Sequence, residues 1–249
     1  MTDPADFYTG LVAELYAPLR SFTPEPEPYA RFIAGSGEPA LELGCGDGDP
    51  LLALRRSGLA VEGLDASADM LERCRAKAAA EGLDVTLHQA RIESMDLGRR
   101  FRSIFLAGPT FNLLVDDDTA LAALERIAAH LEPGGSALIP LFVPEPTPPD
   151  QLGRTREHRL DADTVLAFSV VSEERDEARR RQTSLLRYER RTGDDTTVLE
   201  RSWILHWYSQ AQFADLVART PLTVSSVLDV RGRPASPSDS LFVFRLELI

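Results

Sequence analysis

The sequence predicts an α/β fold with a doubly wound, mostly parallel sheet of seven strands and an antiparallel β insertion after the fifth strand. Short apolar runs alternate five times with helix-like segments between residues 40 and 143, a pattern typical of parallel strands joined by crossover helices. A glycine-rich turn at residues 44–48 follows the first of these runs. Two later apolar runs, at 222–230 and 241–248, indicate a closing antiparallel hairpin.

The N-terminal segment is expected to be helical and then to pass into a linker. Residues 5–20 carry a helical pattern that ends near Pro18. Three prolines at alternate positions between 23 and 28 exclude a helix interior there. A short helix is then expected over residues 29–34.

The five parallel strands are expected at 40–43, 61–64, 85–88, 103–107 and 137–143. Gly58 closes the first crossover helix. Ser67 is a good N-cap for the second, and Gly82 closes it. The helix after the fourth strand is predicted from an apolar stripe, formed by Leu121, Leu124, Ala128 and Leu131.

The pattern changes after Pro144, where a proline-rich loop leads into long alternating strands. Turns are expected at 160–163, 176–177 and 193–194, so we predict an antiparallel insertion. Ser209 and Gln212 then have the spacing of a capping box, which indicates a helix beginning there.

Composition narrows the functional classes. The chain has 249 residues and a formal net charge of −12, which argues against a nucleic-acid partner. Two cysteines predict neither a disulfide framework nor a metal cluster. The N-terminus lacks the basic start and apolar run of a signal peptide, and no apolar stretch approaches transmembrane length. We therefore expect a cytoplasmic protein without a membrane partner.

The turn at 44–48 is expected to hold a ligand. Glycines occupy every second position, so the backbone can bend sharply and approach a bound molecule. Glu42 ends the strand before the turn, and Asp65 ends the next strand, where a carboxylate can accept both hydroxyls of a ribose. The Gly-x-Gly-x-Gly spacing departs from the dinucleotide pattern, which argues against a nicotinamide-dependent oxidoreductase. Acids at 47 and 49 favour a cationic ligand over a pyrophosphate.

These segments resemble class I S-adenosylmethionine-dependent methyltransferases of the small-molecule branch, which includes natural-product and amino-sugar N- and O-methyltransferases. The resemblance is carried by residues 41–48, 63–71, 105–112 and 131–135. It implies a Rossmann-like cofactor domain at 37–145 and 208–249. It also implies an N-terminal helical lid at 1–36 and a substrate cover formed by the insertion at 146–207.

The resemblance also implies roles for individual residues. Asp65 would hold the ribose, Ile92 would cover the adenine, and the glycine turn would line the methionine part. Tyr16 would close over the sulfonium, with helix packing as an equally good alternative. The full set of expected cofactor contacts is Tyr16, Glu42, Gly44, Cys45, Gly46, Asp47, Asp65, Ala66, Met70, Arg91, Ile92, Glu93, Ala107 and Gly108.

Position 91 departs from the family pattern. Related enzymes often have an acid there, which accepts the adenine amino group, whereas arginine has no acceptor. Either a backbone carbonyl or Glu93 takes that role, or Arg91 points to water.

Acceptor contacts are expected from three segments. Thr110, Phe111 and Asn112 follow the fourth strand, and Tyr8 lies in the lid. His206 and Tyr208 near the last insertion strand are the candidate catalytic residues, because histidine titrates in the useful range. A buried or exposed sheet histidine is the alternative for His206.

The predicted function is transfer of a methyl group from S-adenosylmethionine to a nitrogen or oxygen of a small molecule. Residues 108–111 lack the Asn/Asp-Pro-Pro-Tyr/Phe motif of nucleic-acid amine methylases. The alternative is a catalytically silent protein that binds the cofactor or a partner. The sequence leaves open whether the chain forms a homodimer.

Overall fold

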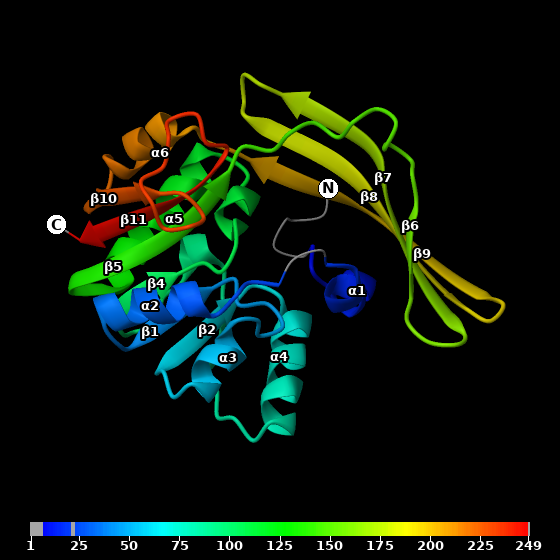
Figure 1. Cartoon of the computed structure of the whole chain (residues 1–249), viewed down its shortest axis with the longest axis horizontal. Coiled ribbons are helices and arrows are strands. Elements are labelled where there is room, and N and C mark those ends of the chain that lie inside the picture. Colours follow the sequence, from blue (N-terminus) through cyan, green and yellow to red (C-terminus); the bar gives the residue numbers. More distant parts are fainter. Residues whose placement is uncertain (1–6, 21–22, 249) are drawn as a thin grey trace.

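The computed structural model describes residues 7–20 and 23–248. Its main element is a seven-stranded sheet with the order β10-β11-β5-β4-β1-β2-β3 (Figure 1). The first five strands in the chain are mutually parallel where they pair. They are β1 Ala40–Leu43, β2 Val61–Asp65, β3 Leu87–Gln89, β4 Phe101–Phe105 and β5 Leu131–Phe142.

The sheet closes with an antiparallel hairpin, as the sequence predicts. β11 Leu241–Leu248 lies antiparallel to β5, and β10 Leu222–Leu228 lies antiparallel to β11. The predicted fold class is therefore confirmed.

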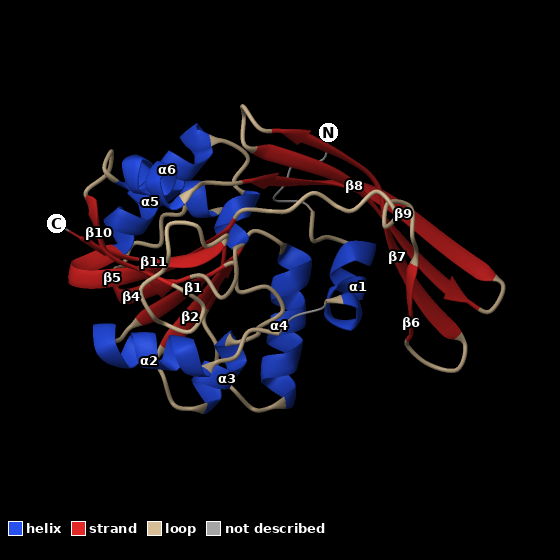
Figure 2. Cartoon of the chain, turned by 45° about the horizontal axis from the view of Figure 1, so that its top comes forward, coloured by secondary structure: helices blue, strands red, loops and turns tan. Residues whose placement is uncertain are grey.

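Helices cover both faces of this sheet (Figures 1 and 2). One apolar cluster joins the sheet to α2 Glu27–Ser36, α3 Leu51–Arg56 and α4 Ala68–Ala80. The other joins it to α5 Asp117–His130 and α6 Gln210–Val217. Two single-turn helices, η2 Ile92–Ser94 and η3 Thr110–Leu113, follow β3 and β4 at the sheet's carboxyl edge.

Local capping fixes several helix starts. The Ser67 hydroxyl accepts the amide of Met70, and Ser209 and Gln212 form the complete capping box, so both sequence predictions are confirmed. Each cap satisfies amides that a first helical turn leaves free.

The N-terminal helix differs from the expectation of 5–20. α1 spans Leu11–Leu19. It begins after Gly10, because the φ of 55° at that residue is not helical. Residues 5 and 6 of the expected helix lie outside the described residues.

The insertion forms a second sheet with the order β6-β7-β8-β9, antiparallel throughout. Its strands are β6 Arg156–Arg159, β7 Thr164–Asp176, β8 Arg181–Thr192 and β9 Asp195–His206. The sheet rises beside the main domain, and α1 lies between the two (Figure 1). Within the described residues, each helix is too short or too polar to cross a membrane.

Candidate functional site

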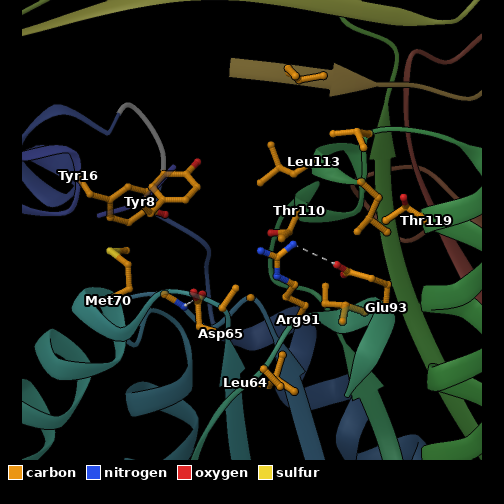
Figure 3. A pocket seen from close by; sticks show the side chains of 18 of the residues that line it. Tyr8, Tyr16, Leu64, Asp65, Met70, Arg91, Glu93, Thr110, Leu113 and Thr119 are labelled. Atoms are coloured by element: carbon orange, nitrogen blue, oxygen red, sulfur yellow. Dashed lines mark hydrogen bonds and ion pairs between the residues drawn. The ribbon is translucent and has the colours of Figure 1, made fainter. Parts of the chain in front are cut away.

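A cavity of about 600 Å³ opens at the carboxyl edge of the main sheet, under α1 and the near end of β9 (Figure 3). Its wall takes residues from three parts of the chain: the lid, the main domain and the insertion. They are Tyr8, Tyr16, Gly44, Gly46, Leu64, Asp65, Ala66, Met70, Ala90, Arg91, Ile92, Glu93, Thr110, Leu113, Leu114, Val115, Thr119, Arg181 and Ile204.

The glycine turn supplies one side of this wall with bare backbone. Gly44, Gly46 and Gly48 have positive φ values of 70°, 54° and 102°, a region that side-chain-bearing residues avoid. A Cβ on Gly44 would lie 2.7 Å from Cγ2 of Thr110. Thr110 therefore packs where a side chain would otherwise stand.

Asp65 lies at the base of the cavity with its carboxylate held in place. Oδ2 accepts the amide of Gly46 and Oδ1 accepts the amide of Ser67, both at 2.8 Å. Burial raises the pKa of Asp65 above its ordinary value, although these two amides work in the opposite direction. Each oxygen keeps lone-pair capacity toward the cavity, since a carboxylate has about four acceptor positions.

Two aromatic rings from the lid stand over Met70 and Asp65 (Figure 3). Tyr8 and Tyr16 meet edge to face, with ring centroids 5.4 Å apart. The Ser67 hydroxyl donates to the carbonyl of Tyr8 at 2.5 Å, which ties the lid to the start of α4. Burial raises the pKa of both phenols, so both keep their protons at neutral pH.

The end of the cavity beyond β2 carries Arg91, Ile92 and Glu93. Nη1 of Arg91 lies 3.9 Å from Oε1 of Glu93, and both side chains border the cavity. The structure thus puts the carboxylate of Glu93 beside Arg91 at this end of the cavity. Whether Glu93 contacts adenine stays a prediction.

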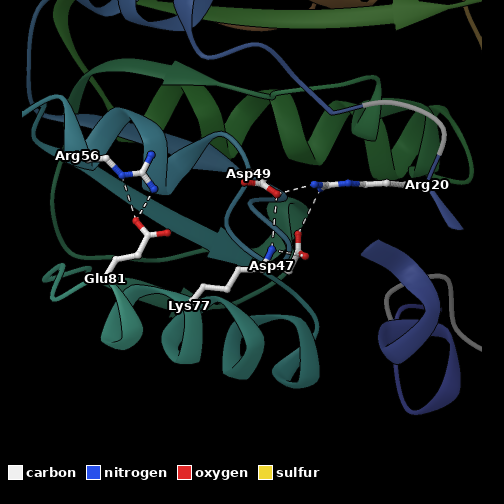
Figure 4. A network of polar contacts seen from close by, with 6 residues as sticks. All are labelled: Arg20, Asp47, Asp49, Arg56, Lys77 and Glu81. Atoms are coloured by element: carbon white, nitrogen blue, oxygen red, sulfur yellow. Dashed lines mark hydrogen bonds and ion pairs between the residues drawn. The ribbon is translucent and has the colours of Figure 1, made fainter. Parts of the chain in front are cut away.

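The acids of the glycine turn do not face the cavity. Asp47 is buried and pairs with Nζ of Lys77 at 2.6 Å, and Asp49 pairs with Nη2 of Arg20 at 2.6 Å (Figure 4). Burial alone would raise the pKa of Asp49, but the hydrogen bond from Arg20 and the charge of Lys77 hold it below its usual value. Two cations thus neutralise the two acids that the sequence suggested would attract a cationic ligand.

Glu42 lies behind the turn rather than on the cavity wall. Its side chain is fully buried, and neither carboxyl oxygen has a hydrogen-bond partner among the residues that the structure describes. Burial, together with the charges of Asp49 and Asp65, raises its pKa well above the ordinary value. A buried carboxyl without a partner is expected to stay protonated.

Four other sequence candidates lie away from the cavity wall. Cys45 and Ala107 are buried in the apolar cluster below the turn, and Gly108 is not among the wall residues. The ring of Phe111 packs edge to face on Phe213, with centroids 5.3 Å apart. The side of η3 that carries Phe111 faces the core, because the apolar ring of Phe111 is more stable buried than exposed.

Asn112 has a structural role in place of the expected acceptor contact. Nδ2 donates to the carbonyls of Phe142 and His206, both at 2.9 Å, and Oδ1 accepts the amide of Phe142 at 3.2 Å. These bonds join the end of β5 to the end of β9. The side chain is fully buried and does not reach the cavity.

His206 and Tyr208, the expected catalytic pair, face the first turn of α5. The Tyr208 hydroxyl donates to Oδ1 of Asp117 at 2.8 Å, and Nε2 of His206 lies 3.5 Å from the same oxygen. Arg180 binds both oxygens of Asp117 at 2.6 Å. Burial lowers the pKa of His206, so the imidazole is neutral at neutral pH. Neither residue is on the cavity wall.

Sequence reasoning missed the part of the wall that faces away from the glycine turn. Leu113 ends η3, Val115 lies in the loop that follows, and Thr119 stands in the first turn of α5. Arg181 and Ile204 come from the insertion. One signal was available, because Ile204 lies two residues before His206 on one strand and so shares its face. The pairing of Arg181 with His206 across β8 and β9 had no local signal.

Within the described part of the chain, no group of three or more His, Cys, Asp or Glu side chains is placed to hold a metal ion. The cavity wall itself offers hydrogen-bonding groups, apolar side chains and the charged groups of Asp65, Arg91, Glu93 and Arg181.

Sequence comparison finds one matching family model and several curated relatives. Residues 40–135 match the family model described as "Methyltransferase domain". The chain is 33% identical over 151 residues to a dTDP-3-amino-3,6-dideoxy-alpha-D-glucopyranose N,N-dimethyltransferase of Streptomyces fradiae, which covers 57% of this chain and 58% of that protein. It is 32% identical over 106 residues to the corresponding 3,4,6-trideoxy sugar enzyme of Streptomyces venezuelae, covering 42% and 43%. These matches span about half the length of the relatives.

Structural comparison covers nearly the whole chain. The sugar N-methyltransferase KedS8 from Streptoalloteichus sp matches with a TM-score of 0.72 at 19% identity, over 95% of this chain and 93% of that one. An S-adenosylmethionine-dependent methyltransferase from Clostridium acetobutylicum matches with a TM-score of 0.74 at 14% identity, over 95% and 97%. At these identities the likeness establishes the fold. Residues 40–135 are thus similar to a methyltransferase domain, and the chain as a whole has the fold of this S-adenosylmethionine-dependent methyltransferase.

Proposed function

We propose that this protein transfers a methyl group from S-adenosylmethionine to an amine of a small molecule, with an oxygen acceptor as the second candidate. The observation that carries the proposal is the position of Asp65. Its carboxylate is held by the amides of Gly46 and Ser67, opens to the cavity, and lies beneath two lid tyrosines. The domain match and the relatives that methylate amino sugars support it.

The described residues fit the proposed cofactor. Asp65 would accept the ribose hydroxyls, Ile92 and Met70 would enclose the adenine, and the bare backbone at Gly44 and Gly46 would leave room for the methionine part. The bound sulfonium supplies an already activated methyl group.

The remaining work of the chain is alignment and exclusion of water. The phenols of Tyr8 and Tyr16 cover the cavity, and each can donate or accept one hydrogen bond to orient an acceptor nitrogen. The amine has to attack in its unprotonated form, so the expected rate falls as pH drops below the amine's own pKa. The neutral His206 lies behind the wall and is not required for this step.

We also infer the domain division, the cellular compartment and the partners of the protein. Wall residues come from the lid (1–36), the cofactor domain (37–145 and 208–249) and the insertion (146–207), which supports the insertion as a substrate cover. We infer that the protein works in the cytoplasm without nucleic acid. The homodimer stays an open expectation.

Calorimetric titration with S-adenosylmethionine and S-adenosylhomocysteine tests the cofactor. Asp65→Ala removes hydrogen bonds to a charged acceptor and should cost about 1.5–3 kcal/mol, or about ten- to hundredfold in affinity. Asp84→Ala is the matched control, because it removes an exposed acid from the same domain. An unchanged affinity in Asp65→Ala would remove the ribose assignment.

Incubation with amino-sugar nucleotides and other amines tests the reaction. Mass spectrometry should detect products that carry one or two additional methyl groups, together with release of S-adenosylhomocysteine. Tight cofactor binding without turnover of any acceptor would favour the catalytically silent alternative.

A further inference from the structure

The lid helix α1 has an apolar side that belongs to the insertion sheet. Val12 and Leu15 are buried in a cluster with Leu166, Leu186 and Tyr188, to which Phe7 also belongs. Because burial of these side chains is the main stabilising contact of such a short helix, α1 and the insertion sheet form one packed body.

The side of the lid that meets the cofactor domain is polar instead. The amide of Gly10 donates to Oδ2 of Asp69 at 2.6 Å, and the carbonyl of Tyr8 accepts the Ser67 hydroxyl at 2.5 Å. Polar contacts can be exchanged for water at little net cost, whereas an apolar contact cannot. We call this polar contact surface between the lid and the cofactor domain the seam. The lid and the insertion sheet are therefore expected to separate from the cofactor domain along it.

Among the lid residues that the structure describes, Arg20 crosses the seam to the acids of the glycine turn. Its Nη2 lies 2.6 Å from Oδ2 of Asp49, and its Nη1 lies 3.6 Å from Oδ1 of Asp47 (Figure 4). The Arg20 side chain is only 18% exposed. Its guanidinium also stands 5.8 Å from the ring centroid of Tyr16, which borders the cavity.

Lys77 approaches the same two acids from the opposite direction. Its Nζ lies 2.6 Å from Asp47 and 3.5 Å from Asp49. It stands on α4, inside the cofactor domain. Both cations therefore neutralise the turn, but Arg20 also joins the turn to the lid.

We propose that Arg20 is a positioning residue that latches the lid onto the glycine turn, so that retention of the cofactor depends on the ion pair with Asp49. This inference rests on the proposed function and adds a link between lid closure and cofactor binding. Asp47 and Asp49 lie within and just after the turn that holds Gly46 against Asp65. The latch thus joins the lid to the glycine turn, which form two walls of the cavity on either side of a bound nucleoside.

Arg20→Met and Lys77→Met form a matched pair of variants, because each removes one cation from the same two acids. Arg20→Met should raise the dissociation rate and the Kd of S-adenosylhomocysteine by about tenfold, as for a partly buried ion pair. Lys77→Met should change them by about twofold, as for a more exposed pair. Arg20→Lys should recover part of the loss, since an ammonium can still pair with Asp49.

Hydrogen exchange of the lid amides is the second readout. Amides of residues 11–19 should exchange faster in Arg20→Met than in the wild type, with and without S-adenosylhomocysteine, and should be unchanged in Lys77→Met. The comparison without ligand tests the latch even if the proposed function fails. Absence of S-adenosylhomocysteine binding by the wild type would count against the proposed function alone.

Two results would overturn the latch. Equal effects of Arg20→Met and Lys77→Met on affinity and on lid exchange would mean that only the charge of the turn matters. A loss of affinity seen with S-adenosylhomocysteine but absent with 5′-methylthioadenosine, which lacks the amino-acid group, would mean that Arg20 contacts that group directly.

Discussion

Gly44→Ala should destabilise the protein through two separable effects. At a φ of 70°, any side chain adds backbone strain of about 1–2 kcal/mol. The new Cβ would also lie 2.7 Å from Cγ2 of Thr110, and overpacking of this kind costs about 1–3 kcal/mol. The expected loss in the free energy of unfolding is about 2–5 kcal/mol, the sum of these two ranges.

Two further variants separate the effects in urea denaturation. Gly58 has a φ of 87° with no atom within 4 Å of an added Cβ, so Gly58→Ala should show the backbone strain alone. Thr110→Ser removes the clashing methyl group, so Gly44→Ala with Thr110→Ser should lose about as much as Gly58→Ala. If the double variant is no more stable than Gly44→Ala, the clash with Thr110 is not the cause and the reasoning fails.

Two other substitutions test buried polar groups. The pKa of Glu42 is raised by burial, so the folded chain holds a proton that the unfolded chain releases. The free energy of unfolding should therefore fall as pH rises from about 4.5 toward the folded pKa, by about 1.4 kcal/mol per pH unit. Glu42→Gln should flatten that slope in urea unfolding between pH 5 and 8, and parallel profiles would contradict it. Asn112→Ala leaves the carbonyls of Phe142 and His206 and the amide of Phe142 without their side-chain partner, so the free energy of unfolding should fall by about 3 kcal/mol. A fall of less than about 1 kcal/mol would show that water replaces these hydrogen bonds.

The sequence alone was enough for features that depend on neighbouring residues. The five strands, the hairpin and the caps at Ser67 and Ser209 follow from period, turn residues and short-range hydrogen bonds, all of which are local. Asp65 was found in the same way, because the end of a strand after a glycine turn is a position that the chain order defines. The turns of the insertion were also predicted from local composition.

The tertiary structure alone decided which polar groups meet. Arg20 and Lys77 neutralise Asp47 and Asp49 from segments about 30 residues away in either direction, and no local pattern specifies such a pair. Asn112, expected at the acceptor, instead joins β5 to β9, because its amide fits unpaired backbone groups that only the packed sheets bring together. The wall residues Arg181 and Ile204 follow from how the insertion sheet sits on the main domain. Periodicity defines a side chain's face, but the partner on that face depends on long-range packing.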